Sequence, residues 1–151
     1  MIVDTVAGIF LRKGRVLVEE RRADDTSPGL VVVPGGHVDR GESLKSALER
    51  EMREELGVRV EKMSPILNRL YTASDGERQR IHYYHVSKWE GLVRSREAER
   101  VFWARAADLS DPREQMIIRN LMTKLAAVHE RASLVADSRP SRRGDKAANL
   151  E

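Results

Sequence analysis

The sequence contains no cysteine, and this absence limits the chemistry open to it. A disulfide framework, a thiol nucleophile and a zinc–thiolate site are all excluded. Any bound metal must therefore be held by oxygen atoms and imidazole groups. The lack of cysteine also fits a protein of the cytoplasm, which is the location we expect.

Long apolar runs are also missing. No segment approaches the roughly 20 apolar residues that a membrane helix needs, and no signal peptide is visible. We therefore expect no membrane partner. The 151 residues, 40% hydrophobic and 34% charged, predict one soluble globular domain with a real core.

The net charge of +3 lies mostly at the C-terminal end. Residues 138–151 hold four basic and two acidic side chains, which is +2 and leaves +1 for the rest. Their Ser, Pro, Gly and Ala content predicts a disordered end rather than a binding arm. We expect a catalytic domain over residues 1–135, a basic tail over 136–151, and no nucleic-acid partner.

The first third of the chain predicts short strands around one loop. Residues 2–11 and 16–20 are apolar and β-branched on either side of a Lys-Gly turn, which predicts an opening hairpin. Residues 21–29 are rich in turn formers. Residues 30–33 then predict a strand that Pro34 stops.

Strands and a second helix are predicted further on. Residues 58–71, 80–89 and 101–104 are extended in pattern, and Asp111-Pro112 opens a helix with an apolar face as far as Val128. This order of strands and helices predicts a mixed α/β sandwich.

A helix from the Ser43 cap to the Gly57 stop lies between these strands. Glu51 and Glu55 are one turn apart and Glu54 is three residues from Glu51, so the three carboxylates share one face. The acidic stripe overlaps the edge of the apolar stripe, and we expect it to lie near the fold. Carboxylates gathered there need cations, and hard oxygen ligands suit Mg²⁺ or Mn²⁺.

Two readings of this acidic helix remain open on spacing alone. Glu42, just before the helix, adds another potential ligand. The alternative is a solvated face neutralised by Glu49–Arg53 and Arg50–Glu54 pairs.

The whole segment from residue 36 to 58 decides between them. Its spaced residues are Gly36, Glu42, Arg50, Glu51, Met52, Glu54, Glu55, Gly57 and Val58. This pattern resembles the Nudix signature G-x5-E-x7-R-E-U-x-E-E-x-G-U, where U is a bulky apolar residue, without departure. A chance match is on the order of 1 in 10⁷ at average residue usage.

The resemblance implies a Nudix-type α/β/α sandwich with a mixed β-sheet. It implies an Mg²⁺-dependent enzyme, with Mn²⁺ as a substitute, that cleaves the diphosphate linkage of a nucleoside diphosphate derivative. Glu51, Glu54 and Glu55 would be metal ligands together with the carbonyl of Gly35. A regulator that keeps the pocket and has lost the chemistry is the alternative of another class, but such modules typically lose box glutamates.

Other residues of the box take supporting roles by the same resemblance. Arg50 would orient Glu51 by a salt bridge and share in catalysis with Glu51 and Glu54. Gly36 would allow the tight turn after Pro34, Glu42 would support the loop, and Gly57 would end the helix.

A general base is expected among the box glutamates or on a loop beyond them, because family members differ on this point. Glu97 is our candidate for the loop residue and Glu99 the second. The alternative for both is a solvated charge in an Arg-Glu repeat.

Residues outside the box bear on the substrate. Arg21-Arg22-Ala23 and Phe102-Trp103 are similar to their counterparts in MutT-type nucleoside triphosphate pyrophosphohydrolases, and the resemblance covers roughly residues 3–125. Arg21 or Arg22 could bind a phosphate in a bidentate manner, and Tyr71 could stack on a base. Solvated arginines and a core tyrosine are the alternatives.

Two subfamily markers are absent. ADP-ribose pyrophosphatases carry a proline about fifteen or sixteen residues beyond the box, and diadenosine polyphosphate hydrolases a tyrosine about seventeen beyond it. Residues 73–75 are Ala-Ser-Asp instead. We therefore expect a nucleoside triphosphate, normal or oxidised, as the small-molecule partner.

Alternatives to that substrate are ADP-ribose, a nucleotide sugar or a dinucleoside polyphosphate. A further alternative is the 5′ end of an RNA, which the basic tail would help to bind. The sequence leaves a homodimer open.

Overall fold

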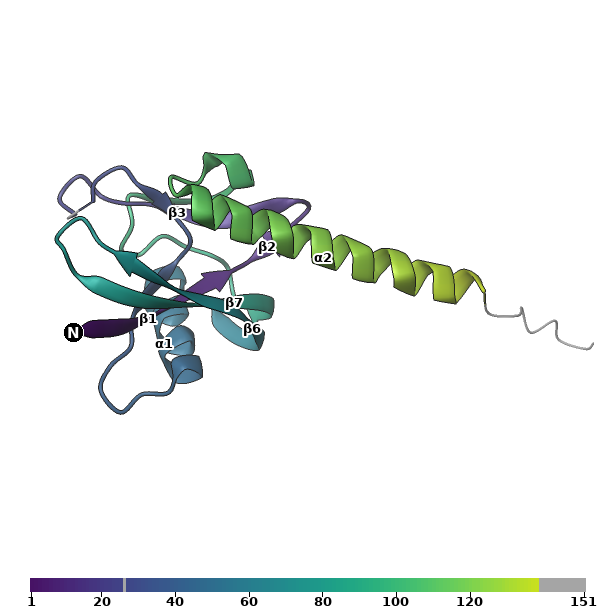
Figure 1. Cartoon of the computed structure of the whole chain (residues 1–151), viewed down its shortest axis with the longest axis horizontal. Helices are drawn as coiled ribbons and strands as arrows, with labels where there is room; N and C mark the ends of the chain where they lie inside the picture. The colour runs from purple at the N-terminus through teal and green to yellow at the C-terminus, as the bar shows by residue number, and fades with distance from the viewer. Residues whose placement is uncertain (26, 139–151) are drawn as a thin grey trace, which may run out of the picture. The chain divides into compact units, whose positions relative to one another are not determined.

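The computed structural model describes residues 1–25 and 27–138 of the chain (Figure 1). These residues fall into two compact units, the first from Met1 to Arg119 and the second beginning at Asn120. The first unit holds all the strands.

One sheet has four strands in the order β5-β1-β7-β6. Their bounds are Ile2–Ile9 for β1, Gly35–His37 for β5, Arg59–Thr72 for β6 and Arg78–Glu90 for β7. β1 pairs in parallel with β7, whereas the β1–β5 and β6–β7 pairs are antiparallel. The predicted mixed sheet is confirmed.

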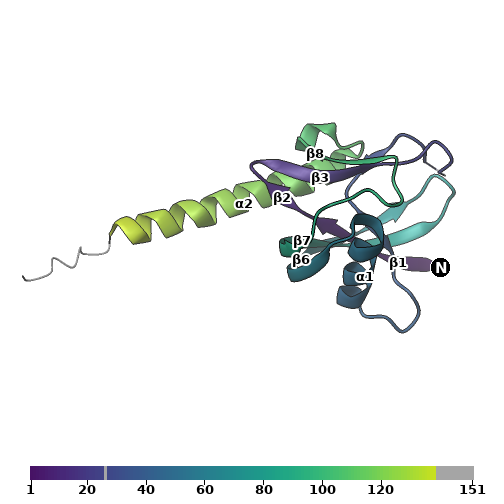
Figure 2. The ribbon, with the colours of Figure 1, turned by 180° about the vertical axis from the view of Figure 1, so that it is seen from behind.

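The second sheet is built around β3 (Figure 2). Its strands are β2 (Leu11–Arg12), β3 (Arg15–Glu20), β4 (Val31–Val32) and β8 (Arg100–Ala104). β3 pairs antiparallel with each of the other three.

The opening hairpin is shorter than the sequence predicts. Its Lys13-Gly14 turn is present, with φ of 50° and 72°, but only β2 pairs with β3 across it. The predicted strand over residues 2–11 is divided at Phe10, which is fully buried, and its two parts belong to different sheets. Pro34 divides β4 from β5 in the same way, and β5 itself is an addition to the predicted strands.

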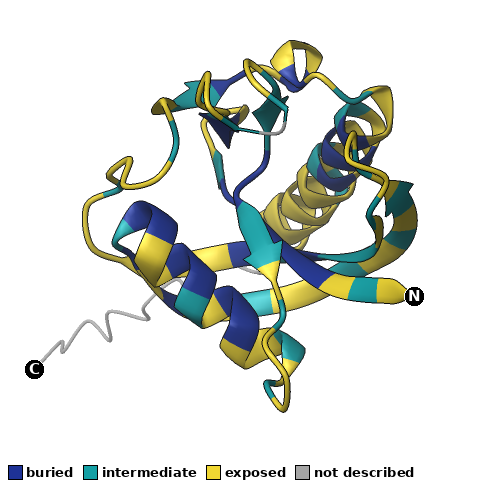
Figure 3. Cartoon of the chain, turned by 90° about the vertical axis from the view of Figure 1, so that its left-hand side faces the viewer, coloured by how far each residue is buried: buried dark blue, intermediate teal, exposed yellow. Residues whose placement is uncertain are grey.

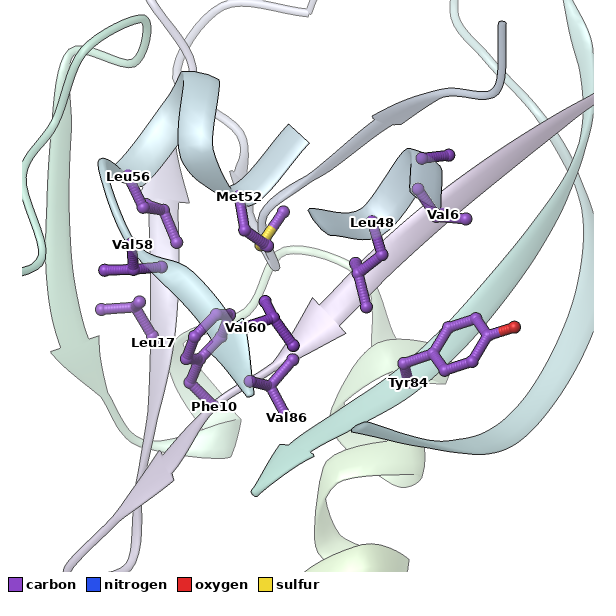
Figure 4. Packing of buried hydrophobic residues seen from close by; sticks show 11 residues of the cluster. Val6, Phe10, Leu17, Leu48, Met52, Leu56, Val58, Val60, Tyr84 and Val86 are labelled. Atoms are coloured by element: carbon purple, nitrogen blue, oxygen red, sulfur yellow. The ribbon is translucent and has the colours of Figure 1, made fainter. Parts of the chain in front are cut away.

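Helix α1 (Leu44–Leu56) packs its apolar face on the core. Leu48, Met52 and Leu56 are fully buried there against side chains from both sheets, including Val6 and Leu17 (Figure 4). Buried and exposed positions alternate along α1, as an amphipathic pattern requires (Figure 3).

A short 3₁₀ helix, η1 (Ala106–Asp108), precedes α2 (Pro112–Asp137). Successive residues of a strand face opposite sides of its sheet. Tyr84 of β7 belongs to the cluster beneath α1, while its neighbour Tyr83 hydrogen-bonds to Glu114 in the first turn of α2. α1 and the start of α2 therefore cover opposite faces of this sheet, as expected for a sandwich.

The second unit, taken alone, contains the remainder of α2. Several of its apolar side chains, among them Val128, Leu134 and Val135, are exposed. No helix among the described residues is long and apolar enough to cross a membrane. The predicted boundary at residues 135/136 falls in the last turn of α2, and residues 139–151 of the predicted tail lie outside the described residues.

Candidate active site

Helix α1 carries the three box carboxylates and is capped at both ends. The Ser43 side chain accepts a hydrogen bond of 3.1 Å from a first-turn backbone N–H, and Gly57 ends the helix at a φ of 71°. Glu51 and Glu55 are buried, while Glu54 is exposed. The acidic face therefore lies partly under the fold, as its overlap with the apolar stripe predicts.

Arg50 is the centre of an ion-pair network. Its guanidinium donates to both oxygens of Glu42, at 2.8 and 2.9 Å, and to the backbone carbonyl of His37 at 2.9 Å. It also donates to Glu51 at 2.9 Å and to Glu54 at 3.2 Å. The hydrogen bonds from Arg50 lower the pKa of Glu42. The expected Arg50–Glu51 salt bridge is present, and Glu42 contacts the same guanidinium.

Gly35 and Gly36, at the start of the box, allow close contacts that no other residue would permit. A Cβ at Gly36 would lie 2.2 Å from the carboxyl carbon of Glu51, and one at Gly35 would lie 2.2 Å from the backbone oxygen of Val6. Gly35 therefore lets β5 approach β1, and Gly36 leaves room for the Glu51 side chain.

A carboxylate from outside the box lies against Glu55. Glu19 of β3 is buried, and its carboxyl group is within hydrogen-bonding reach of that of Glu55. Glu19 Oε1 and Glu55 Oε2 are buried without a partner among the described residues. Burial, with the charge of Glu19 beside it, raises the pKa of Glu55 to about 10. Such a pair needs a cation or a shared proton to be neutralised.

The loop between β7 and β8 brings Glu97 to these carboxylates. The backbone N–H of Arg96 donates to the carbonyl of Glu55 at 3.1 Å, and that of Glu99 donates to the carbonyl of Glu20 at 3.0 Å. Glu97 is exposed between these two anchors, and its charge adds to burial in raising the pKa of Glu55. The structure thus brings Glu97 to the box, while Glu99 is tied to the end of β3.

The potential metal ligands of the box fit a hard divalent cation, because all of them are oxygen atoms. One of the buried carboxylates, Glu55, also has an oxygen without a partner among the described residues. Glu51 and Glu54 are held by Arg50. Among the described residues, no three His, Asp or Glu side chains are close enough together to hold a metal ion as they stand. Glu51, Glu54, Glu55 and the Gly35 carbonyl are the groups that could hold the ion.

A pocket of about 810 Å³ adjoins the box glycines. Gly35 and Gly36 line it together with the predicted Arg21 and Tyr71. Arg22, the alternative to Arg21, is exposed and is not among the described residues that line the pocket.

A buried polar network also lines this pocket. The Tyr83 hydroxyl donates to Glu114 at 2.8 Å and accepts from Arg69 at 3.1 Å, and Arg69 pairs with Asp111. Glu114 is 6% exposed, and its Oε1 has no partner among the described residues. Burial raises the pKa of Glu114. The pocket wall therefore includes a buried carboxyl group that keeps its proton to a higher pH than an exposed glutamate does, because burial raises its pKa.

Glu19, Arg69 and Glu114 were not predicted as site residues. The sequence pattern could have indicated Glu19, because it lies two residues after Leu17 in β3 and so on the same, buried side of the strand, although it is charged. Glu114 similarly lies one turn before Ile118, on the apolar side of α2. A carboxylate at a position where the pattern predicts a buried apolar residue therefore indicates a functional site.

Comparison with known proteins gives concordant matches. A NUDIX domain model matches residues 2–125. The CTP pyrophosphohydrolase of Escherichia coli (strain K12) is 31% identical over 102 residues, 68% of this chain and 75% of that protein. The putative 8-oxo-dGTP diphosphatase 2 of Mycobacterium tuberculosis (strain ATCC 25618 / H37Rv) is 34% identical over 108 residues, 70% and 75% of the two chains.

Solved structures agree with this match. The MutT NUDIX hydrolase from Burkholderia pseudomallei superposes with a TM-score of 0.69 at 25% identity, over 79% of this chain and 97% of that one. The E. coli ORF135 protein does so with a TM-score of 0.68 at 27% identity, over 83% and 92%.

Proposed function

The chain belongs to the Nudix family and is a hydrolase, and on that basis we propose that it cleaves a nucleoside triphosphate into a nucleoside monophosphate and pyrophosphate. Relatives named for CTP and for 8-oxo-dGTP support this substrate class. We place the reaction in the cytoplasm, consistent with a sequence that has no cysteine.

The observation that carries the proposal is the pocket beside the box. Its 810 Å³ lies within the range of about 300–1,000 Å³ typical of small-ligand sites, and is enough for one nucleoside. Its wall includes Gly36, which lies against the Glu51 carboxyl group, and also Glu114, whose buried Oε1 has no partner among the described residues. A nucleotide can therefore place its phosphates at the box and its base against a polar group.

We assign the divalent cation, Mg²⁺ with Mn²⁺ as substitute, to Glu51, Glu54, Glu55 and the Gly35 carbonyl. When bound, such ions neutralise phosphate oxygens and lower the pKa of a bound water. This chemistry is needed because the anionic oxygens of a diphosphate repel a nucleophile.

The remaining groups of the site bind, orient and accept a proton. Arg50 holds Glu51 in place through their 2.9 Å contact. Glu97 is our candidate to accept the proton of the attacking water, since the loop hydrogen bonds hold it beside the buried carboxylates. Arg21 lines the pocket, and we assign it to bind a phosphate.

Glu114 and Tyr71 suit recognition of the base. Glu114 lines the pocket, and its carboxyl group can hydrogen-bond to a polar edge of a base. Tyr71 lines the same pocket and offers a ring for stacking.

The test is a panel of nucleoside triphosphates, including CTP and 8-oxo-dGTP, with diphosphate sugars, ADP-ribose and dinucleoside polyphosphates, assayed with Mg²⁺. We expect a triphosphate to have the highest kcat/KM and to yield a monophosphate and pyrophosphate. Turnover of ADP-ribose, a sugar or a dinucleotide without turnover of any triphosphate would reject the proposal. Glu114→Ala should lower kcat/KM by about 10-fold or more for the preferred base, while Glu114→Gln retains part of the contact.

A further inference from the structure

We propose that Glu19, which lies outside the Nudix box, is an additional ligand of the divalent cation, so that the metal centre extends from α1 to strand β3. The inference rests on the proposed function, because it concerns the same metal centre. It adds a residue that the signature does not contain.

The strand places Glu19 on the face of the sheet that α1 covers. Leu17 packs in the core with residues of α1, and Glu19 follows two residues later on the same side. Glu19 is 8% exposed, although a glutamate is almost never buried unless it is paired. Glu20, the next residue, faces the other way and pairs with Arg100.

The partner that Glu19 meets there is another carboxyl group. Glu55, also 8% exposed, is within hydrogen-bonding reach, yet Glu19 Oε1 and Glu55 Oε2 have no partner in the described part of the chain. Two like charges in a buried place repel each other, and a cation between them would convert this cost into an attraction. Glu19 and Glu55 thus each offer a metal ion a buried carboxylate oxygen that has no partner among the described residues.

A third chain segment closes the same cluster. The Arg96 N–H bonds to the Glu55 carbonyl and the Glu99 N–H bonds to the Glu20 carbonyl, so the loop joins α1 to β3 and keeps Glu97 beside both. The carboxylates near the ion then come from β3, α1 and the loop. A set made only of hard oxygen donors favours Mg²⁺ or Mn²⁺ over softer metals.

The test measures Mn²⁺ binding to the full-length, substrate-free protein by isothermal titration calorimetry and by electron paramagnetic resonance. Glu19→Gln should weaken Mn²⁺ binding by 10-fold or more, or remove one bound ion. Glu20→Gln is the matched control, being the same change on the opposite face of the same strand, and should bind as the wild type does. Thermal unfolding without metal should show Glu19→Gln to be at least as stable as wild type, because a like charge is removed, and added Mn²⁺ should raise its Tm less.

Each contrary result has a definite meaning. If Glu19→Gln binds Mn²⁺ like the wild type, Glu19 is not a ligand. If it is less stable without metal and binds Mn²⁺ normally, Glu19 only shares a proton with Glu55, and the inference is wrong. If either of these results is found and the wild type still hydrolyses triphosphates with Mg²⁺, the proposed function stands and only the inference about Glu19 is wrong. If the wild type binds no Mn²⁺ at all, the assignment of the box ligands and that of Glu19 are both wrong.

Discussion

At the scale of single residues, Glu54 offers the cleanest separation of catalysis from stability. Its side chain is 49% exposed and pairs with Arg50 at 3.2 Å, and an exposed ion pair of this kind contributes little to the stability of the fold. Loss of a metal-ligating carboxylate should lower kcat by more than about 100-fold, since even supporting groups of metal sites cost 10–100-fold. We therefore expect Glu54→Gln to abolish turnover with an almost unchanged Tm.

Steady-state kinetics and thermal unfolding of Glu54→Gln check this expectation. Glu49→Gln is the control, because Glu49 is an exposed glutamate of the same helix outside the signature. Activity of Glu54→Gln near that of wild type would refute the assignment of Glu54 as a metal ligand.

Glu114 gives the stability a pH dependence with a definite sign. Burial raises the pKa of Glu114 above its ordinary 4.5, so the folded chain retains this proton to a higher pH than the unfolded chain does. The wild type should therefore lose stability as pH rises from 4.5 to the raised pKa. Glu114→Gln cannot ionise, and its free energy of unfolding relative to wild type should increase over that window.

Urea unfolding of both proteins at several pH values between 4 and 8 measures this difference, in which the other titrating groups cancel. A difference that stays constant with pH would mean that Glu114 titrates alike in the folded and unfolded chains.

The residues of the site were predictable to different degrees for a physical reason. Glu51, Glu54 and Glu55 share one helix, so their spacing alone places them on one face. Glu19 reaches Glu55 only because β3 packs under α1, and Arg69 reaches Tyr83 across the β6–β7 pair. Contacts of this kind depend on tertiary packing, which spacing within one segment does not contain.

At the scale of elements, the two glycines of β5 lie against different neighbours, Gly35 against the β1 backbone and Gly36 against the Glu51 side chain. Gly35→Ala places a methyl group 2.2 Å from the Val6 backbone oxygen, which cannot move without loosening β1 from β5. We expect a loss of roughly 1–3 kcal/mol of stability. Gly36→Ala meets the Glu51 carboxyl group instead, which can rotate away.

We expect Gly36→Ala to lower kcat by about 10–100-fold, because Glu51 moves from its Arg50 contact, with a smaller loss of stability than Gly35→Ala. Urea unfolding and kcat/KM, measured on both variants, separate the two effects. The assignment is wrong if Gly36→Ala is fully active or if Gly35→Ala unfolds like the wild type.

Several elements followed from local pattern, and others did not. The α1 bounds and the Lys13-Gly14 turn are local features and were predicted. The division of the first strand at Phe10 was not, because both parts are apolar and a change of sheet leaves no mark on periodicity. The β5 strand was missed because Gly35 and Gly36 disfavour strands on propensity and are held there by β1.

At the scale of the whole molecule, the predicted basic tail can be tested by deletion. Residues 138–151 carry a charge of +2, and the family match ends at residue 125. We expect deletion of 138–151 to leave kcat/KM for nucleoside triphosphates unchanged, because the pocket and the box lie within residues 1–119. Kinetics at low and physiological salt, with RNA-binding assays on both forms, check this; reduced turnover or RNA affinity lost on deletion would contradict it.

The mixed fold followed from the order of strands and helices together with the signature. The partition of the strands into two sheets did not follow, since it depends on pairings between distant residues such as Glu19 with Val101.

The parallel pairing of β1 with β7 also has a consequence for the order of events during synthesis. Each residue of β1 pairs with one 76 positions later, as Ile2 does with Arg78. At ribosomal rates of about 5–20 residues per second, β1 must wait roughly 4–15 s for its partner. β5, which contains Gly35 and Gly36, pairs with β1, so a nascent chain can complete helix α1 well before β7 is available to extend the sheet. Enzymatic activity is therefore a late product of translation in this protein.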